Sequence, residues 1–272
     1  MLFLAVPLGA MVAAVVLLLL VSFSGQGQQP ASKKAAIIDQ LGLTSPNPSF
    51  VEATTSMLEG AGYTVDYYPG EEVTVGLYRD LPSRGYGLIV LRVHSALLGQ
   101  DLVNSAEVSP GTLERALTAL QDNVFLFTSE PYSETGYLEE QKALRVVPAR
   151  YYSGDGPRHS RYFAVSSDFV SSSMKGEFHR TLVVLMGCDG LTFDRTAAAF
   201  VEKGARGVVG WNGPVSASHT DAATGRLLER LVVDRYTIGE AVTEVMAELG
   251  PDPSYGSNLI VYPAEAAGDV GP

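Results

Sequence analysis

The chain has 272 residues, a formal net charge of −11 at pH 7 and a sequence pI near 4.8. Hydrophobic residues make up 46% and charged residues 18%, which excludes wholesale disorder, and the length suits one α/β domain or at most two small ones. The acidic balance argues against a nucleic-acid partner, because no basic excess is present to neutralise phosphates. The single cysteine excludes an intrachain disulfide framework and a zinc site with several cysteine ligands.

The first part of the chain is uncharged. Residues 1–32 contain no Asp, Glu, Lys, Arg or His, and residues 2–21 form a nearly continuous apolar run. Twenty helical residues span roughly 30 Å, the thickness of a bilayer's hydrocarbon core, so we expect a transmembrane anchor over residues 1–22. A cleaved secretory signal is the alternative. The length of the run, the lack of a basic segment before it and the lack of an A-x-A site after it disfavour a signal.

The sequence does not determine on which side of the membrane the folded domain lies. Lys33 and Lys34 favour the cytoplasm by the positive-inside tendency, but an N-terminal anchor often exports the domain attached to its C-terminal end. We expect a flexible linker over residues 23–34, a folded domain over residues 35–263 and a disordered tail over residues 264–272. The chain is thus predicted to be a single-pass membrane protein.

Strand patterns alternate with helical patterns along the domain. Strands are predicted over residues 35–39, 63–68, 86–93, 124–129, 181–186, 205–211 and 258–263, and extended segments between residues 143 and 165 are expected to form a hairpin or a sheet edge. Helices are predicted over residues 50–62, 112–120, 191–204, 222–233 and 238–249, with shorter ones within residues 71–85 and 132–141. This alternation predicts one doubly wound α/β domain, in which helices cover both faces of a mostly parallel sheet of about six strands.

Several common functional motifs are absent. The sequence has no phosphate-binding G-x-x-x-x-G-K-[ST] loop, no G-x-G-x-x-G after a strand and no G-x-S-x-G nucleophile elbow. The four histidines, His94, His159, His179 and His219, do not pair at metal-ligand spacing, and no calcium loop is visible. Nucleotide enzymes, serine hydrolases and metalloenzymes are therefore disfavoured, and we expect no metal and no cofactor.

One histidine and the one cysteine each follow a predicted parallel strand, where α/β sheets commonly bind ligands. Cys188 lies just before the helix expected from Leu191, whose N-terminal partial charge would lower the pKa of the thiol. His94 could act as the general base that a thiol nucleophile needs, with His219, in the loop after the next strand, as a second candidate. Each residue also has a purely structural interpretation, as a small core side chain or a strand-end histidine.

The two strand ends carry a resemblance. The segments YGLIVLRVHS, with His94, and TLVVLMGCDG, with Cys188, resemble the two short blocks of the caspase-like (clan CD) cysteine peptidases. In that group, one hydrophobic strand ends in His and another ends in Cys. The stretch after the cysteine, over residues 204–232 and 237–242, is similar to the strand, loop and helices that follow the cysteine in CHAT and gingipain-type domains, and the likeness as a whole covers roughly residues 35–250. The resemblance implies a caspase-like three-layer α/β/α sandwich. In this chain the sandwich would follow the transmembrane helix predicted over residues 1–22, which is not a general feature of the group.

The resemblance also implies roles for individual residues. His94 would be the base and Cys188 the nucleophile, and the backbone N–H groups of Cys188 and of the Ser95 region would form the oxyanion hole. Ser95 departs from the family pattern, because a glycine usually follows the histidine. Asp39 and Asp189 are the acidic candidates for a pocket that would select Lys or Arg side chains of a substrate.

Three alternative functions are compatible with the sequence. The first is a membrane-anchored cysteine endopeptidase that hydrolyses peptide bonds of a peptide or protein substrate with a His94/Cys188 dyad. The second is a catalytically inactive caspase-like domain that serves as a membrane-tethered binding or sensing module. The third is an unrelated flavodoxin-like or glycosidase-like α/β domain.

Overall fold

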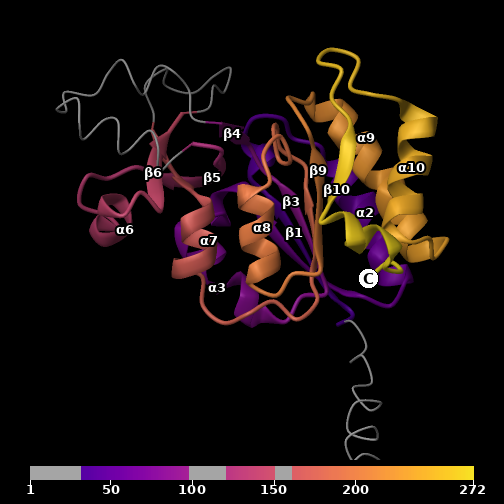
Figure 1. The fold of residues 1–272 in the computed structure, drawn as a ribbon, viewed down its shortest axis with the longest axis horizontal. Coiled ribbons are helices and arrows are strands. Elements are labelled where there is room, and N and C mark those ends of the chain that lie inside the picture. The colour runs from indigo at the N-terminus through magenta and orange to yellow at the C-terminus, as the bar shows by residue number, and fades with distance from the viewer. Residues whose placement is uncertain (1–31, 98–120, 151–160) are drawn as a thin grey trace, which may run out of the picture. The chain divides into compact units, whose positions relative to one another are not determined.

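The computed structural model describes residues 32–97, 121–150 and 161–272 (Figure 1). The predicted anchor, most of the predicted linker and the helix predicted over residues 112–120 lie outside these ranges. Within the described residues, no helix combines the length and the apolar character needed to cross a bilayer.

A six-stranded sheet forms the centre of the domain (Figure 1). Its strands, in spatial order, are β10 (Leu259–Tyr262), β9 (Gly207–Trp211), β8 (Leu182–Leu185), β3 (Leu88–Arg92), β1 (Lys34–Asp39) and β2 (Thr64–Pro69). All neighbouring strands are parallel except β10, which pairs with β9 in the antiparallel sense. The predicted mostly parallel sheet of about six strands is therefore confirmed.

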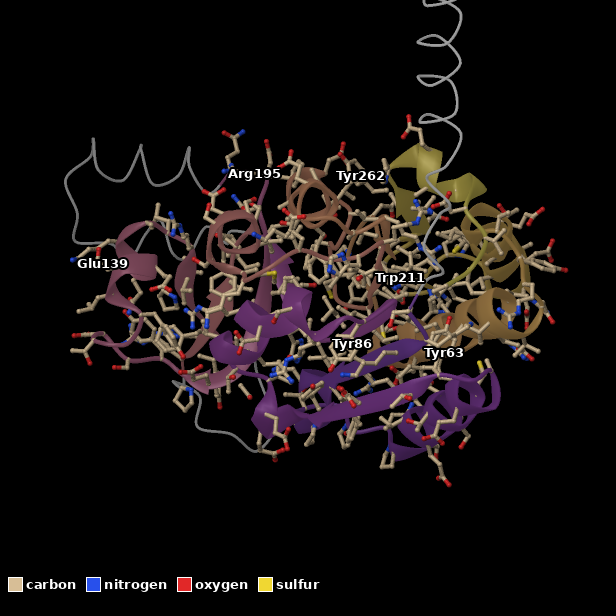
Figure 2. All side chains as sticks on the ribbon, turned by 90° about the horizontal axis from the view of Figure 1, so that it is seen from below. Tyr63, Tyr86, Glu139, Arg195, Trp211 and Tyr262 are labelled. Atoms are coloured by element: carbon tan, nitrogen blue, oxygen red, sulfur yellow. The ribbon has the colours of Figure 1, made fainter. Side chains whose placement is uncertain are left out.

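Alternate side chains of each strand enter two separate cores, one on each face of the sheet. In β1, Ala36 and Ile38 pack with α3 (Val75–Asp80), α7 (Ser167–Ser173) and α8 (Arg195–Glu202). Ala35 and Ile37 pack with α2 (Pro48–Gly60), α9 (Ala217–Leu228) and α10 (Ile238–Leu249). Trp211, labelled in Figure 2, is fully buried in this second core. Because successive side chains of a strand point to opposite faces, the apolar runs of this sheet require helices on both sides.

A second, smaller sheet is antiparallel and has the order β4 (Ser95–Leu97), β5 (Val124–Pro131), β7 (Tyr162–Val165) and β6 (Val146–Ala149). The pairing of β6 with β7 confirms the extended pair expected between residues 143 and 165. The chain leaves the large sheet at Arg92 and enters the small one at Ser95, so His94 lies where the two sheets meet.

Short elements complete the fold. They are α6 (Leu138–Lys142), the 3-10 turns η1 (Gln40–Leu43), η2 (Gly70–Glu72), η3 (Leu81–Arg84) and η5 (Ala264–Gly268), and the π-helical turn η4 (Glu229–Val233). Thr237 forms a reciprocal capping box with Glu240 at the start of α10.

Three sequence expectations need correction. The helix after Cys188 begins at Arg195 instead of near Leu191, because backbone bonds to the β9 segment hold the intervening residues in turns. Helix α9 begins at Ala217, so the loop predicted around His219 is shorter than expected. The predicted disordered tail carries η5, and Val270 forms a bridge with Thr237, so packing orders this Ala- and Gly-rich segment.

Candidate active site at the carboxyl edge of the sheet

His94 and Cys188 follow two neighbouring parallel strands. Strands β3 and β8 are paired up to Leu91 and Leu185, and His94 and Cys188 each lie three positions beyond these residues. The Ser95 hydroxyl donates a 2.6 Å hydrogen bond to the backbone oxygen of Cys188, which ties the two segments together. The structure therefore brings the histidine segment and the cysteine segment into contact at one edge of the sheet.

This close approach explains the glycine before the cysteine. A Cβ atom at Gly187 would overlap the Ser95 hydroxyl oxygen and the backbone oxygen of Val93. Any larger residue would force the β8 end away from the β3 end. Gly187 is therefore required by the contact between the two strand ends.

Cys188 is half-buried and is held by Val215. Its sulfur accepts a hydrogen bond from the Val215 backbone N–H at 3.4 Å and lies 3.5 Å from the Val215 backbone oxygen. Burial raises the pKa of the thiol, the Val215 N–H opposes this shift, and the charges of Asp189 and Asp252 add to it. Because α8 begins seven residues after Cys188, the expected thiolate stabilisation by a helix N-terminus is absent. The resting group is a protonated thiol at neutral pH.

The backbone at Ser95 is suited to donate a hydrogen bond away from the small sheet. The Phe127 N–H donates to the His94 oxygen, so His94 and Phe127 form a hydrogen-bonded pair of the β4–β5 ladder. Antiparallel ladders alternate between bonded and non-bonded pairs, so the next pair, Ser95 and Leu126, leaves the Ser95 N–H facing away from β5. The Asp189 N–H, in contrast, already donates a hydrogen bond to the Gly213 backbone oxygen.

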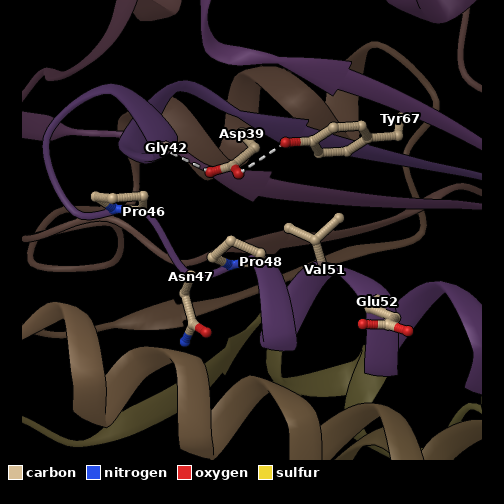
Figure 3. Close-up of a pocket in the computed structure, with 8 residues that line it drawn as sticks. All are labelled: Asp39, Gly42, Pro46, Asn47, Pro48, Val51, Glu52 and Tyr67. Carbon is tan, nitrogen blue, oxygen red and sulfur yellow. Dashed lines mark hydrogen bonds between the residues drawn. The ribbon is translucent and has the colours of Figure 1, made fainter.

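Asp39, one of the two expected pocket residues, lines a cavity of about 360 Å³ beside β1 (Figure 3). Its carboxylate is already occupied: Oδ1 accepts from the Gly42 N–H at 2.9 Å, and Oδ2 accepts from the Tyr67 hydroxyl at 3.1 Å. Neither His94 nor Cys188 lines this cavity. The side chain of Asp39 is only 3% exposed, so the cavity offers a substrate little of this carboxylate.

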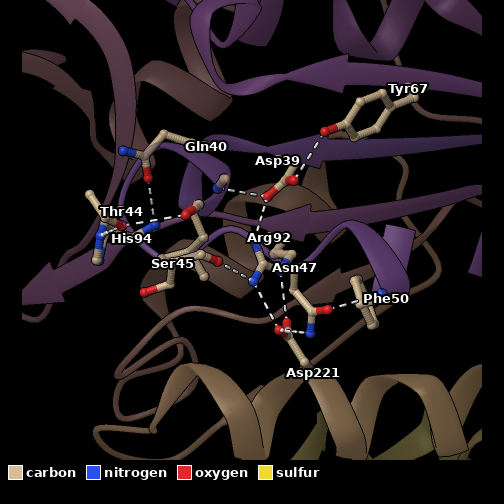
Figure 4. Close-up of polar contacts among 12 residues, drawn as sticks. Asp39, Gln40, Thr44, Ser45, Asn47, Phe50, Tyr67, Arg92, His94 and Asp221 are labelled. Carbon is tan, nitrogen blue, oxygen red and sulfur yellow. Dashed lines mark hydrogen bonds and ion pairs between the residues drawn. The ribbon is translucent and has the colours of Figure 1, made fainter. Parts of the chain in front are cut away.

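A buried arginine between two carboxylates, which the sequence analysis missed, lies beneath the edge (Figure 4). Arg92 is fully buried and donates to Asp39 Oδ1 at 2.6 Å, to both carboxylate oxygens of Asp221 at 2.7 and 2.8 Å, and to the Ser45 backbone oxygen at 2.7 Å. Burial alone would lower the pKa of Arg92, but the hydrogen bonds to Asp221 and Asp39 raise it. Asn47 donates to Asp221 and also caps α2. Arg92 thus joins β1, β3, α9 and the loop before α2.

The same loop holds His94 (Figure 4). The His94 backbone N–H donates to Gln40 Oε1 at 2.8 Å, and the ring nitrogen Nε2 shares a 2.8 Å hydrogen bond with the Thr44 hydroxyl. Burial lowers the pKa of His94 to about 4, and the positive charge of Arg92 contributes to this shift. The imidazole is therefore neutral at physiological pH and able to accept a proton.

The other predicted residues, Asp189 and His219, form no hydrogen bond with the Arg92 and His94 network. Asp189 has a left-handed backbone, with φ of 59°, and its carboxylate accepts from the Thr192 hydroxyl at 3.1 Å. It does not line the cavity beside Asp39, so the two proposed pocket carboxylates do not share a pocket there. His219 lies in helix α9 with its ring 5.3 Å from that of Trp211, and its Nε2 atom is buried without a hydrogen-bond partner. His219 therefore packs in the core layer beside Trp211.

The sequence carries a signal for Arg92 but none for Asp221. An arginine inside the apolar run YGLIVLRV must find partners when the strand is buried. The partner Asp221 lies 129 residues away, and sequence spacing alone does not identify it.

Across the ranges that the structure describes, no group of three His, Cys, Asp or Glu side chains could hold a metal ion. Comparison with known proteins assigns no family, since no protein-family model matches the chain and no curated protein matches its sequence. The structure establishes an α/β domain with a six-stranded, mostly parallel sheet, a small antiparallel sheet and a histidine and a cysteine at one edge.

Proposed function

We propose that the chain is a membrane-anchored, caspase-like cysteine endopeptidase with His94 as the base and Cys188 as the nucleophile. One observation carries this proposal: the two residues follow neighbouring parallel strands whose ends are joined by the Ser95–Cys188 hydrogen bond. The resemblance of the two strand ends to the caspase-like blocks and the three-layer α/β/α arrangement support it.

The charge states leave the dyad general-base activation in place of a preset ion pair, with His94 as a weak base because its pKa is lowered. The thiol is protonated at rest and the imidazole is neutral, so His94 takes the thiol proton as sulfur attacks the peptide carbonyl carbon. The tetrahedral oxyanion would receive hydrogen bonds from the N–H groups of Ser95 and Cys188. The C–N bond then breaks, the imidazolium protonates the leaving amine, and water hydrolyses the thioester with His94 again accepting a proton.

Thr44 would be a positioning residue in this scheme. Its hydroxyl bonds Nε2 of His94 and so sets the rotation of the ring, while the Gln40 side chain fixes the backbone of the same residue. Loss of the Thr44 hydroxyl should lower the rate of the chemical step with little effect on substrate binding.

A second function is favoured by the same electrostatics. A thiol with a raised pKa next to an imidazole with a pKa of about 4 does not form a preset ion pair. The Ser95 side chain also occupies the space between the strand ends and binds the Cys188 oxygen. An inactive, membrane-tethered binding module is the alternative consistent with these two facts.

Covalent labelling tests the proposal. The full chain is treated with peptides that end in a thiol-reactive electrophile after Lys, Arg, Asp or Leu. The wild type and His219→Ala should be labelled, whereas Cys188→Ala and His94→Ala should not. Reaction of His94→Ala with a small alkylating agent at high pH checks that its thiol is still accessible.

Equal labelling of wild type and His94→Ala would refute the dyad. Failure of every peptide to label the wild type, with the thiol accessible to the small reagent, would favour the inactive module. The variant Ser95→Gly then tests whether the serine in place of the usual glycine prevents labelling. Gain of labelling in this variant would identify the Ser95 side chain as the block.

A further inference from the structure

Basic side chains gather at the opposite edge of the large sheet, where the parallel strands begin. Lys33 precedes β1, Arg180 precedes β8 and Arg206 precedes β9. Arg235 lies just before α10, and its positive charge lowers the pKa of Lys33 in addition to the effect of burial. We call Lys33, Arg180, Arg206, Arg235 and Tyr63 the amino-edge cluster. It is a concentration of positive charge in a chain whose net charge is −11.

These cations have few hydrogen-bond acceptors and few carboxylate partners. Arg180 pairs with Asp269 at 3.1 Å, which is the one Asp or Glu among the described residues to form an ion pair with the cluster. Arg206 donates one bond, to the Val270 backbone oxygen at 2.9 Å, and Lys33 donates to the Pro272 oxygen at 3.4 Å. Burial lowers the pKa of Arg206, Asp269 opposes the shift, and the neighbouring charge of Arg180 adds to it. For Arg206, burial is thus the main cost of the charge, and the attraction of Asp269 outweighs the repulsion of Arg180.

Three buried donors of the cluster have no acceptor. Nε and Nη2 of Arg206 and the hydroxyl of Tyr63 are buried without a hydrogen-bond partner. Tyr63, labelled in Figure 2, is 4% exposed, and the Lys33 ammonium lies 4.2 Å from the centre of its ring. Unpaired buried donors are rare in folded proteins, and beside the cations of the cluster they make a set of donors suited to an oxygen-rich anion.

The opposite edge carries the opposite charge. Four carboxylates, those of Asp39, Asp189, Asp221 and Asp252, lie around the candidate active site, and Arg92 compensates one of them. The two edges thus differ in charge. The four cations of the amino edge lie with Asp269 and, beside Arg235, with Glu240 and Glu244, whereas the carboxyl edge carries an excess of carboxylates. An anionic surface would attract the first edge and repel the second.

We propose that the amino-edge cluster binds the phosphate of an anionic phospholipid headgroup and so holds the His94/Cys188 edge facing away from the bilayer. The proposal rests on the membrane anchor of the proposed function. Lys33 follows the end of the predicted span by about a dozen residues, which reach at most about 40 Å when extended, so this length of chain allows the amino edge to reach the headgroups. Basic residues next to a span commonly bind anionic lipid.

Energy transfer measures the docking. The full chain is placed in lipid nanodiscs made with or without phosphatidylglycerol, and transfer from tryptophan to a dansyl-labelled lipid is recorded. Trp211 is the chain's single tryptophan and is fully buried, so the signal reports the distance of the domain from the bilayer. Wild-type transfer should be higher with phosphatidylglycerol and should fall as salt is added.

Three variants test whether docking depends on the amino-edge cluster itself or only on the total positive charge of the domain. Arg206→Gln/Arg235→Gln should weaken docking by about fivefold for each cation removed. Tyr63→Phe keeps the ring and the net charge and should also weaken docking, because only the unpaired hydroxyl is lost. Lys142→Gln/Arg226→Gln removes two exposed cations elsewhere and should dock nearly as the wild type does. Thermal unfolding confirms that each variant is folded.

The proposal is overturned if phosphatidylglycerol does not raise transfer, or if the gain survives Arg206→Gln/Arg235→Gln. A separate measurement follows the unfolding midpoint of the full chain in neutral detergent, with inorganic phosphate or chloride at equal ionic strength. A midpoint raised by phosphate in the wild type but not in Arg206→Gln, without any nanodisc gain, would assign the cluster to free phosphate and overturn lipid docking. Peptide labelling of Cys188 does not depend on this edge, so the two proposals fail independently.

Discussion

Replacing Arg92 with methionine tests how the carboxyl edge is held together. The change leaves the carboxylates of Asp39 and Asp221, whose side chains are only 3% and 6% exposed, without the guanidinium that lies between them, and it removes four hydrogen bonds. Removing one partner of a buried ion pair costs about 3–5 kcal/mol. Because Asp39 keeps the Gly42 and Tyr67 donors and Asp221 keeps Asn47, we expect a loss of about 4 kcal/mol in the free energy of unfolding.

Urea unfolding of the full chain in neutral detergent measures this loss, with Arg226→Met as the matched control. Arg226 forms exposed ion pairs with Glu229 and Glu248, and such pairs contribute about 1 kcal/mol or less. The loss of unfolding free energy in Arg92→Met should become smaller as the pH falls, because protonated carboxyl groups of Asp39 and Asp221 carry no charge to bury. Arg92→Met/Asp39→Asn/Asp221→Asn should recover most of the stability. A loss below about 1 kcal/mol, or a triple variant no more stable than Arg92→Met, would refute the reasoning.

Four further outcomes are expected from the structure. His94 has a folded pKa of about 4 against an ordinary 6.5, so the unfolded chain takes up a proton first as the pH falls. Wild-type stability should therefore drop by about 3 kcal/mol across this window, and His94→Asn should lack this drop in a urea series over pH. The alkylation rate of Cys188 should still rise above pH 9.0, because burial raises the pKa of its thiol; a plateau near neutral pH would contradict this. Thr237→Ala should cost about 1 kcal/mol of unfolding free energy by removing the cap of α10. Gly187→Ala should cost about 1–3 kcal/mol, and Ser95→Ala in the same chain should reduce that cost; an unchanged cost would show that the Ser95 hydroxyl is not the obstacle.

The large sheet could be predicted because its strands are short apolar runs that end in polar or glycine residues. TLVVLM and YGLIVL have no other stable place than between two helical layers, and the structure puts them there as β8 and β3. The spatial order of the strands in the sheet could not be predicted from the sequence. That β3 lies between β1 and β8 follows from the packing of all the helices together, and the contact between the His94 and Cys188 segments depends on this order.

The spacing of apolar residues predicted the wrong helix start where backbone groups distant in sequence take the hydrogen bonds that a helix would need. The segment after Cys188 has helical spacing, yet the Leu191 N–H donates to the Trp211 oxygen and the Asp189 N–H donates to the Gly213 oxygen. Two bonds to the end of β9, together with the left-handed backbone of Asp189, delay the helix to Arg195. The C-terminal segment was misjudged for a similar reason, since the Ile238 N–H bonds the Asp269 oxygen and orders a sequence of weak intrinsic preference.

The position of His94 depends less on its own strand than on the loop over residues 40–47. Strand β3 ends at Arg92, and beyond it the ring is held by Thr44 and the backbone by Gln40, both of which belong to or adjoin η1. That loop is in turn fixed by the bond from Arg92 to the Ser45 oxygen, so a buried charge two residues before the histidine sets the frame in which the imidazole is oriented. Because hydrogen bonds to an arginine are directional and cannot be rebuilt by a methionine of similar length, the network determines the geometry of the site as well as the stability of the edge. A variant that keeps the fold but loosens Arg92 should therefore impair a His94-dependent reaction before it unfolds the domain.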